Sequence, residues 1–201
     1  MPETIRPFHA SDLPALYRIC LLTGDASADA TNLYRDPDLL GHMYAGPYPV
    51  ADPGLSFVVV DEQGVCGYIV ATADTYRFER WLAQSWFPVL REEFPLVDDP
   101  RDGTQDHGLI RQFHEFAPVD KPLFRTHPAH MHIDLLPRAQ RKGLGRRLIE
   151  TLSDALRERG VPGLHLGVDS RNTGGIAFYD RMGFTSAGPT GGASLLTLDL
   201  L

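Results

Sequence analysis

Apolar residues recur at two spacings along this chain, and the spacing separates the expected helices from the expected strands. The clearest helix covers residues 143–159, where leucine returns at every fourth position and Gly160 ends the pattern. Short β-branched or alternating apolar runs predict strands instead. The expected helices are residues 11–24, 36–46, 76–94, 105–115, 143–159 and 172–182, and the expected strands are residues 4–8, 55–60, 65–73, 130–136, 164–168 and 194–200.

The order of these elements predicts an α/β fold. Residues 55–73 hold two strands joined by a polar turn, which is typical of a hairpin. The last third of the chain alternates strand and helix, as parallel βαβ units do. Residues 76–128 interrupt this order with helical sequence and a Pro- and Asp-rich stretch. A length of 201 residues suits one domain, so we expect residues 1–201 to form a single domain with 76–128 as a helical insertion.

Composition and charge narrow the class of protein. Hydrophobic residues make up 43% of the chain and charged residues 22%, which excludes wholesale disorder and a coiled coil. The net charge of −7 argues against a nucleic-acid partner, and the lack of an 18-residue apolar run argues against a membrane span. Cys20 and Cys66 lack metal-type spacing, and the first residues lack a signal-peptide pattern, so we expect a cytoplasmic protein with free thiols. A homodimer stays open as its assembly.

The most informative stretch runs from Leu135 to Gly145, where a predicted strand leads through a tight turn directly into a helix. Glycine lets the backbone approach a ligand closely, and free N–H groups at a helix start suit a pyrophosphate. A solvated basic first turn is the alternative, although cations there oppose the helix dipole. The stretch lacks the Gly-Lys-Ser/Thr ending of the P-loop and the three spaced glycines of the dinucleotide fingerprint. Five cations fall within ten residues and no acid lies between them: Arg138, Arg141, Lys142, Arg146 and Arg147.

Two motifs in this region carry a family resemblance. Gln140-x-x-Gly143-x-Gly145 after a strand resembles the acetyl-coenzyme A motif of the GNAT superfamily of N-acetyltransferases. Asn172, followed seven residues later by Tyr179 and then by Gly183-Phe184, resembles the second signature of that superfamily. The resemblance covers roughly residues 129–188. It implies a GNAT fold, which is a mixed, mostly antiparallel sheet with a splayed central strand pair and helices on both faces.

A narrower resemblance extends over most of the chain. Five short motifs are similar to the acetyltransferase-like C-terminal domain of O-GlcNAcase and its stand-alone bacterial relatives. They are residues 4–7, 38–41, 65–68, 85–88 and 131–134. The long insert at 76–128 is shared with that domain, and this chain keeps the cofactor loop.

The resemblance implies acetyl-CoA as co-substrate, no metal, and direct acetyl transfer to an unidentified amine. Tyr179 matches the usual general acid, since a phenol with a reference pKa of ~10 suits protonation of a thiolate. A core tyrosine is the alternative reading of Tyr179, and a helix N-cap is the alternative or additional role of Asn172. The implied cofactor-binding residues are Leu135, Leu136, Gln140, Arg141, Lys142, Gly143, Leu144, Gly145, Arg146, Asn172 and Tyr179.

Three polar residues alternate along one predicted strand, so they face the same side of the sheet: His130, His132 and Asp134. They suit a base with its orienting partners, a metal-ligand set, or a hydrogen-bonded structural cluster. The usual base position of the GNAT superfamily falls nearer Ala129 or Met131. Asp134 ranks first as the catalytic candidate, because it lies at the cofactor-facing end of the strand.

Two other functions stay open at this point. The first is a catalytically inactive pseudoenzyme that binds the coenzyme or a protein partner without turnover. The second is a metal-dependent hydrolase built on the His-x-His-x-Asp strand. In the leading interpretation, an N-acetyltransferase, the insert at 76–128 is expected to cap the acceptor end of the split strand.

Overall fold

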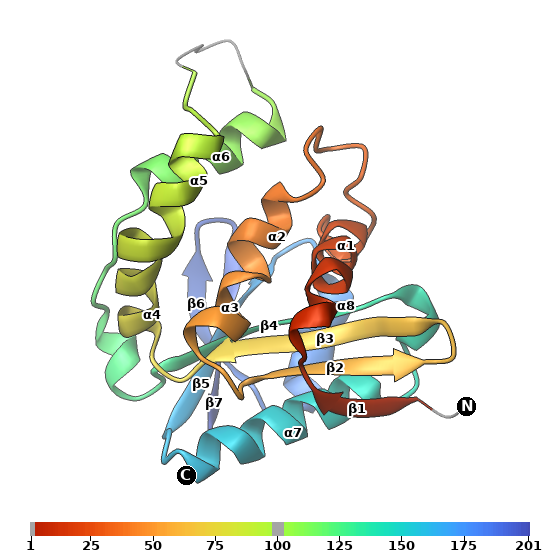
Figure 1. The fold of residues 1–201 in the computed structure, drawn as a ribbon. Helices are drawn as coiled ribbons and strands as arrows, with labels where there is room; N and C mark the ends of the chain where they lie inside the picture. The colour runs from red at the N-terminus through yellow and green to blue at the C-terminus, as the bar shows by residue number, and fades with distance from the viewer. Residues whose placement is uncertain (1–2, 98–102) are drawn as a thin grey trace.

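A seven-stranded sheet forms the centre of the molecule in the computed structural model, which describes residues 3–97 and 103–201 (Figure 1). The strand order is β1-β2-β3-β4-β5-β7-β6, and only β4 and β5 pair in parallel. The strands are β1 (Thr4–Pro7), β2 (Ser56–Asp61), β3 (Gly64–Thr72), β4 (Ala129–Leu135), β5 (Gly163–Asp169), β6 (Thr185–Thr190) and β7 (Ala193–Asp199).

Helices cover both faces of this sheet. α1 and α3 lie over one face of the sheet with α2 packed against both, and α7 lies along the opposite face (Figure 1). The helices are α1 (Leu13–Thr23), α2 (Leu39–Tyr44), α3 (Pro47–Ala51), α4 (Thr75–Trp81), α5 (Phe87–Glu93), α6 (Gln105–Glu115), α7 (Leu144–Glu158) and α8 (Thr173–Arg181). A π-helical turn spans Leu82–Trp86, and 3-10 turns span Ala10–Asp12, Pro122–Arg125 and Pro137–Ala139. The described helices include none with the length and hydropathy that a membrane crossing requires.

The leucine repeat of α7 explains why this helix packs on the sheet. Its four leucines are almost completely buried, at positions 144, 148, 152 and 156. Burial of a leucine side chain stabilises a fold by ~1.5–3 kcal/mol, so this stripe fixes the helix against β2 and β3. The predicted helix and the predicted hairpin of β2 and β3 are therefore both confirmed.

The central strands diverge, as the GNAT resemblance implies. β4 pairs with β5 only through Ala129 with Leu164 and His130 with His165. On its other side β4 stays paired with β3 as far as Leu135. The two central strands therefore form a V that opens toward their C-terminal ends, and the α/β fold with a splayed strand pair is confirmed.

Four features of the structure differ from the expectation. The helix expected at 36–46 begins only at Leu39, and a further short helix, α3, follows from Pro47. The helix expected at 76–94 contains a π-turn immediately before Pro88, whose missing N–H prevents a regular helix there. Strand β6 was not predicted, because its exposed sequence TSAGPT has no apolar run, and β7 runs antiparallel to β5 rather than continuing a parallel series.

The insert between β3 and β4 is anchored where the two strands meet it. Thr75 donates from its backbone N–H and its hydroxyl to the carbonyl oxygen of Pro128, at 2.8 and 2.7 Å. Phe87 and Phe113 stack with ring centroids 5.5 Å apart and belong to the same buried cluster as the sheet residues. We therefore propose that residues 1–201 form a single domain, with 76–128 as a helical insertion whose residues 98–102 lie outside the described part.

Candidate functional site

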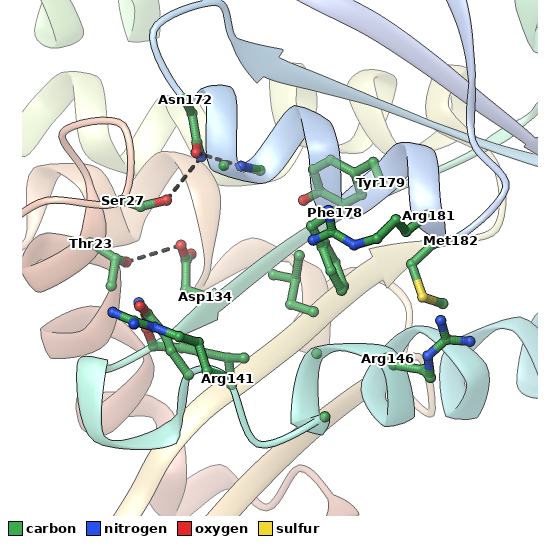
Figure 2. A pocket seen from close by; sticks show the side chains of 17 residues that line it. Thr23, Ser27, Asp134, Arg141, Arg146, Asn172, Phe178, Tyr179, Arg181 and Met182 are labelled. Atoms are coloured by element: carbon green, nitrogen blue, oxygen red, sulfur yellow. Dashed lines mark hydrogen bonds between the residues drawn. The ribbon is translucent and has the colours of Figure 1, made fainter.

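A cavity of about 570 Å³ opens where β4 and β5 diverge (Figure 2). Its walls come from the end of α1, from β4, from the turn into α7, and from α8. No described residue of the insert lines it. The lining residues are Thr23, Ser27, Ile133, Asp134, Leu135, Gln140, Arg141, Gly143, Gly145, Arg146, Asn172, Gly174, Gly175, Phe178, Tyr179, Arg181 and Met182.

The turn into α7 leaves backbone donors free at the cavity. Arg141 and Gly143 adopt left-handed backbone angles, with φ of +58° and +75°. Gly143 caps α7 without a side-chain hydrogen bond, and no acidic residue lies in the first turn. The first N–H groups of a helix have no partner within it, so those of residues 144–146 are available to an anion. This uncapped helix start fits the pyrophosphate of a coenzyme A.

The five cations of this region separate into two groups. Arg138 is held by Asp61 at 2.8 Å, and Lys142 is held by Glu3 at 2.5 Å, so neither lines the cavity. Arg147 does not line it either. Arg141 and Arg146 do line it, and Arg181 of α8, which was not predicted, joins them.

Three predicted cofactor-binding residues do not present side chains to the cavity. Lys142 is turned onto Glu3, as described above. Leu144 is buried in the core, although its N–H belongs to the free first turn of α7. The N–H of Leu136 donates to Cys66 of β3 at 2.9 Å. Successive residues of a strand point their backbone groups toward opposite neighbouring strands. The N–H groups of Ile133 and Leu135 therefore face the gap between β4 and β5.

Asn172 joins the start of α8 to the loop after α1. Its side-chain oxygen accepts from the N–H of Gly175 at 2.8 Å, which is the N-cap role. Its side-chain nitrogen donates to the hydroxyl of Ser27 at 2.9 Å, as Figure 2 shows. The side chain of Asn172 therefore caps α8 and lines the cavity at the same time.

Tyr179 projects from α8 into the same cavity. Its ring lies 5.3 Å from the rings of both Phe178 and Phe184. Within the described residues its hydroxyl has no hydrogen-bond partner. Burial, and then the charge of Asp134, raise the pKa of this phenol, so it keeps its proton at neutral pH.

Asp134 is held by two hydroxyl groups. Tyr68 donates to one carboxylate oxygen at 2.5 Å, and Thr23 donates to the other at 3.0 Å. Burial raises the pKa of Asp134, while both hydrogen bonds act in the opposite direction by favouring the charged form. This places a proton-accepting group with raised basicity on the cavity wall.

His130 and His132 share the sheet face of Asp134 but do not line the cavity. His130 accepts from Tyr48 on one ring nitrogen and contacts the hydroxyl of Thr75 with the other, both at 2.8 Å. His132 packs against the rings of Tyr44 and Tyr48 at 5.4 and 5.3 Å. The described residues contain no group of three ligands that could hold a metal ion. This geometry matches the structural-cluster interpretation of the two histidines.

The buried state of His132 gives a testable acid sensitivity. Burial lowers its pKa to about 4, so the folded protein favours the neutral ring. The contribution of the neutral His132 ring to the free energy of unfolding is complete above pH ~6.5, the pKa of histidine in the unfolded chain. It is lost as the pH falls toward 4, and the loss amounts to ~2 kcal/mol between pH 7 and pH 5. His132→Phe should remove this part of the loss of stability between pH 7 and pH 5, as measured by urea unfolding at the two pH values. His9→Asn, which alters an exposed histidine, is the control, and an equal pH dependence in His132→Phe and wild type would contradict the prediction.

Several cavity residues had no clear signal in the sequence. Phe178 lies three residues after Gly175, and Met182 lies three residues after Tyr179, so the helical spacing of this motif could have found them. Thr23 and Ser27 come from the other end of the chain, and no local pattern relates them to Asp134. Only the tertiary packing of α1 against β4 brings them to the site.

Comparison with known proteins defines the class. The model of the acetyltransferase (GNAT) family matches residues 29–184, and this chain therefore belongs to that family. Protein O-GlcNAcase of Rattus norvegicus is 25% identical over 183 residues, which is 90% of this chain and 20% of that protein. The chain thus spans about a fifth of the length of these curated relatives.

Two further proteins show the range of the similarity. The [ribosomal protein bS18]-alanine N-acetyltransferase of Escherichia coli K12 is 49% identical over 51 residues, which is 25% of this chain and 34% of that enzyme. The crystal structure of SsHAT matches the whole of both chains with a TM-score of 0.92 and 36% identity. The structure of yncA from Salmonella typhimurium with acetyl-CoA has a TM-score of 0.55 at 20% identity, covering 99% of this chain and 94% of that one, and shares the fold.

Proposed function

We propose that this chain binds acetyl-CoA in the V between β4 and β5 and transfers the acetyl group directly to an amine. The observation that carries the proposal is the composition of one cavity. The free N–H groups at the start of α7 lie there together with Asp134 and Tyr179. An anion-binding turn, a proton acceptor and a proton donor are the parts that this reaction requires.

Binding is assigned to the turn and the splayed strand. The first turn of α7 and Arg141 would hold the pyrophosphate, and the N–H groups of Ile133 and Leu135 would hold the arm of the coenzyme. Bound acetyl-CoA supplies an activated acetyl thioester. Neither cysteine lines the cavity, and burial raises the pKa of both thiols, which supports direct transfer without an acyl-enzyme.

Asp134 and Tyr179 are assigned opposite proton transfers. Asp134 would accept a proton from the amine, because burial raises its basicity while Tyr68 and Thr23 fix its position. Tyr179 would donate its hydroxyl proton to the departing sulfur, since the phenol is protonated at neutral pH and its side chain lines the same cavity. The two groups share one cavity, so they can act on the same reacting centre.

The test is turnover over a panel of amines. Release of the CoA thiol from acetyl-CoA is measured with peptides, polyamines, aminoglycosides and small amines, and CoA binding is measured in parallel by calorimetry. Release that depends on one amine class supports the proposal and identifies the acceptor. Tight CoA binding with no release for any amine supports the alternative, a coenzyme-binding module without turnover. No binding at all contradicts both.

The hydrogen bond from Tyr68 gives a prediction about pH. Tyr68→Phe removes a donor that favours the charged form of Asp134, so the pKa of Asp134 should rise. The acidic limb of the kcat/KM profile should then move to higher pH. Tyr76→Phe, on the exposed surface of α4, is the control. A limb that stays in place or moves to lower pH would remove Asp134 from the proton-accepting role.

A further inference from the structure

The side of the cavity between α7 and α8 combines cations with apolar surface. We call it the α7–α8 side; it consists of Arg146, Phe178, Arg181 and Met182. Figure 2 shows Arg146 and Met182 opposite each other, with Arg181 extending alongside Phe178. An aromatic ring and a thioether next to two guanidinium groups form a surface for a planar, apolar group that carries an anion.

The cations of this side are not neutralised by nearby carboxylates. Among the described residues Arg181 has no ion-pair partner. Arg146 approaches only Glu150, at 3.7 Å, and both side chains are more than half exposed, so the pair is weak. Other cations near the cavity are closely paired, such as Arg171 with Asp25 at 2.9 Å and with Asp169 at 2.8 Å. In a protein of net charge −7, arginines at a cavity wall that are unpaired or only weakly paired point to an anionic ligand.

Coenzyme A carries two separate anionic groups, the pyrophosphate and a 3′-phosphate on its ribose. The first turn of α7 and Arg141 account for the pyrophosphate, which leaves Arg146 and Arg181 without a ligand. We propose that Arg146 and Arg181 bind the 3′-phosphate while Phe178 and Met182 contact the adenine. This inference rests on the proposed function, and it makes the α7–α8 side the part of the site that distinguishes coenzyme A from dephospho-coenzyme A.

A structural role for Arg181 has a different consequence. Arg181 lies in the last turn of α8, where a cation interacts favourably with the helix dipole. If that were its only role, its replacement would lower the thermal stability and would change the affinity of both coenzymes equally. The two ligands differ only in the 3′-phosphate, so comparing them separates the roles.

The experiment is calorimetric titration of the full chain with coenzyme A and with dephospho-coenzyme A. Wild type should bind coenzyme A at least about tenfold more tightly. Arg181→Gln and Arg146→Gln should each weaken coenzyme A binding by about tenfold and leave dephospho-coenzyme A binding unchanged. Arg147→Gln is the matched control, because this arginine lies on the same helix turn outside the cavity and should leave both affinities unchanged.

The outcomes separate this inference from the proposed function. Equal binding of the two ligands by wild type would overturn the inference while coenzyme binding stands. An equal loss for both ligands in Arg181→Gln would also overturn it. Failure of wild type to bind either ligand would overturn the proposed function itself. Selective loss of the 3′-phosphate preference in the two arginine variants would establish the α7–α8 side as its determinant.

Discussion

Replacing Tyr179 with phenylalanine is expected to lower kcat by about 10²–10⁴-fold and to leave the affinity for coenzyme A almost unchanged. The ring packs against Phe178 and Phe184, and phenylalanine keeps those contacts. The hydroxyl has no protein partner among the described residues, so its loss strands no buried donor or acceptor. The only group removed is the proton that we assign to the departing sulfur.

Steady-state kinetics with the amine found in the panel, together with calorimetry, measures the two effects separately. Tyr76→Phe removes a phenol hydroxyl on the exposed side of α4 and should behave like wild type. If Tyr179→Phe kept the wild-type kcat, Tyr179 would be a packing residue of α8. A parallel loss of affinity and kcat would assign the hydroxyl to coenzyme binding instead.

The turn into α7, where we propose that the coenzyme binds, could be predicted because its signals are local. Gly143 is required by a backbone angle of +75°, and Gly145 by the approach of α8. The two glycines stand together at the start of one helix, so the Gly143-x-Gly145 spacing marks this turn in the sequence, although the contact that Gly145 makes with α8 is tertiary. The leucine stripe of α7 fixes the same helix against the sheet, and the pattern and the fold agree there.

The orientation of the cations could not be predicted from the same stretch. Arg138 and Lys142 turn away because their partners, Asp61 and Glu3, lie on β2 and just before β1. Those strands are distant in the sequence and adjacent only in the folded protein. A charge run shows how many cations a segment holds, whereas the tertiary fold decides which of them face a ligand.

The surroundings of the three polar residues on β4 were harder to predict for a similar reason. The alternation of His130, His132 and Asp134 placed the three on one face correctly, and the position of Asp134 at the end of the strand ranked it first, but the partners of each side chain could not be predicted. Tyr48 and Thr75 occupy both nitrogens of His130, whereas Asp134 meets Tyr68 and Thr23 at the cavity wall. This difference between His130 and Asp134 is made by side chains of four other elements, namely α1, α3, β3 and α4. No local spacing in the sequence encodes it.

The second large effect is expected at Gly145. Leucine at this position should lower the affinity for coenzyme A by about 100-fold or more, while the melting temperature stays close to that of wild type. A Cβ atom at Gly145 would lie 3.2 Å from the ring of Phe178 and 3.6 Å from the side chain of Leu135. The remaining atoms of a leucine would therefore occupy the cavity where the pyrophosphate is proposed to lie.

The same change should not weaken α7 itself. Gly145 has no left-handed backbone angle, and leucine favours helices more than glycine does by up to ~1 kcal/mol. Gly145→Ala should lose less affinity, because a methyl group displaces only the edge of Phe178. Gly108→Leu in α6 is the matched control, since an added Cβ there meets nothing within 4 Å. Calorimetry and thermal melting measure both quantities, and unchanged affinity in Gly145→Leu would place the coenzyme outside the V between β4 and β5.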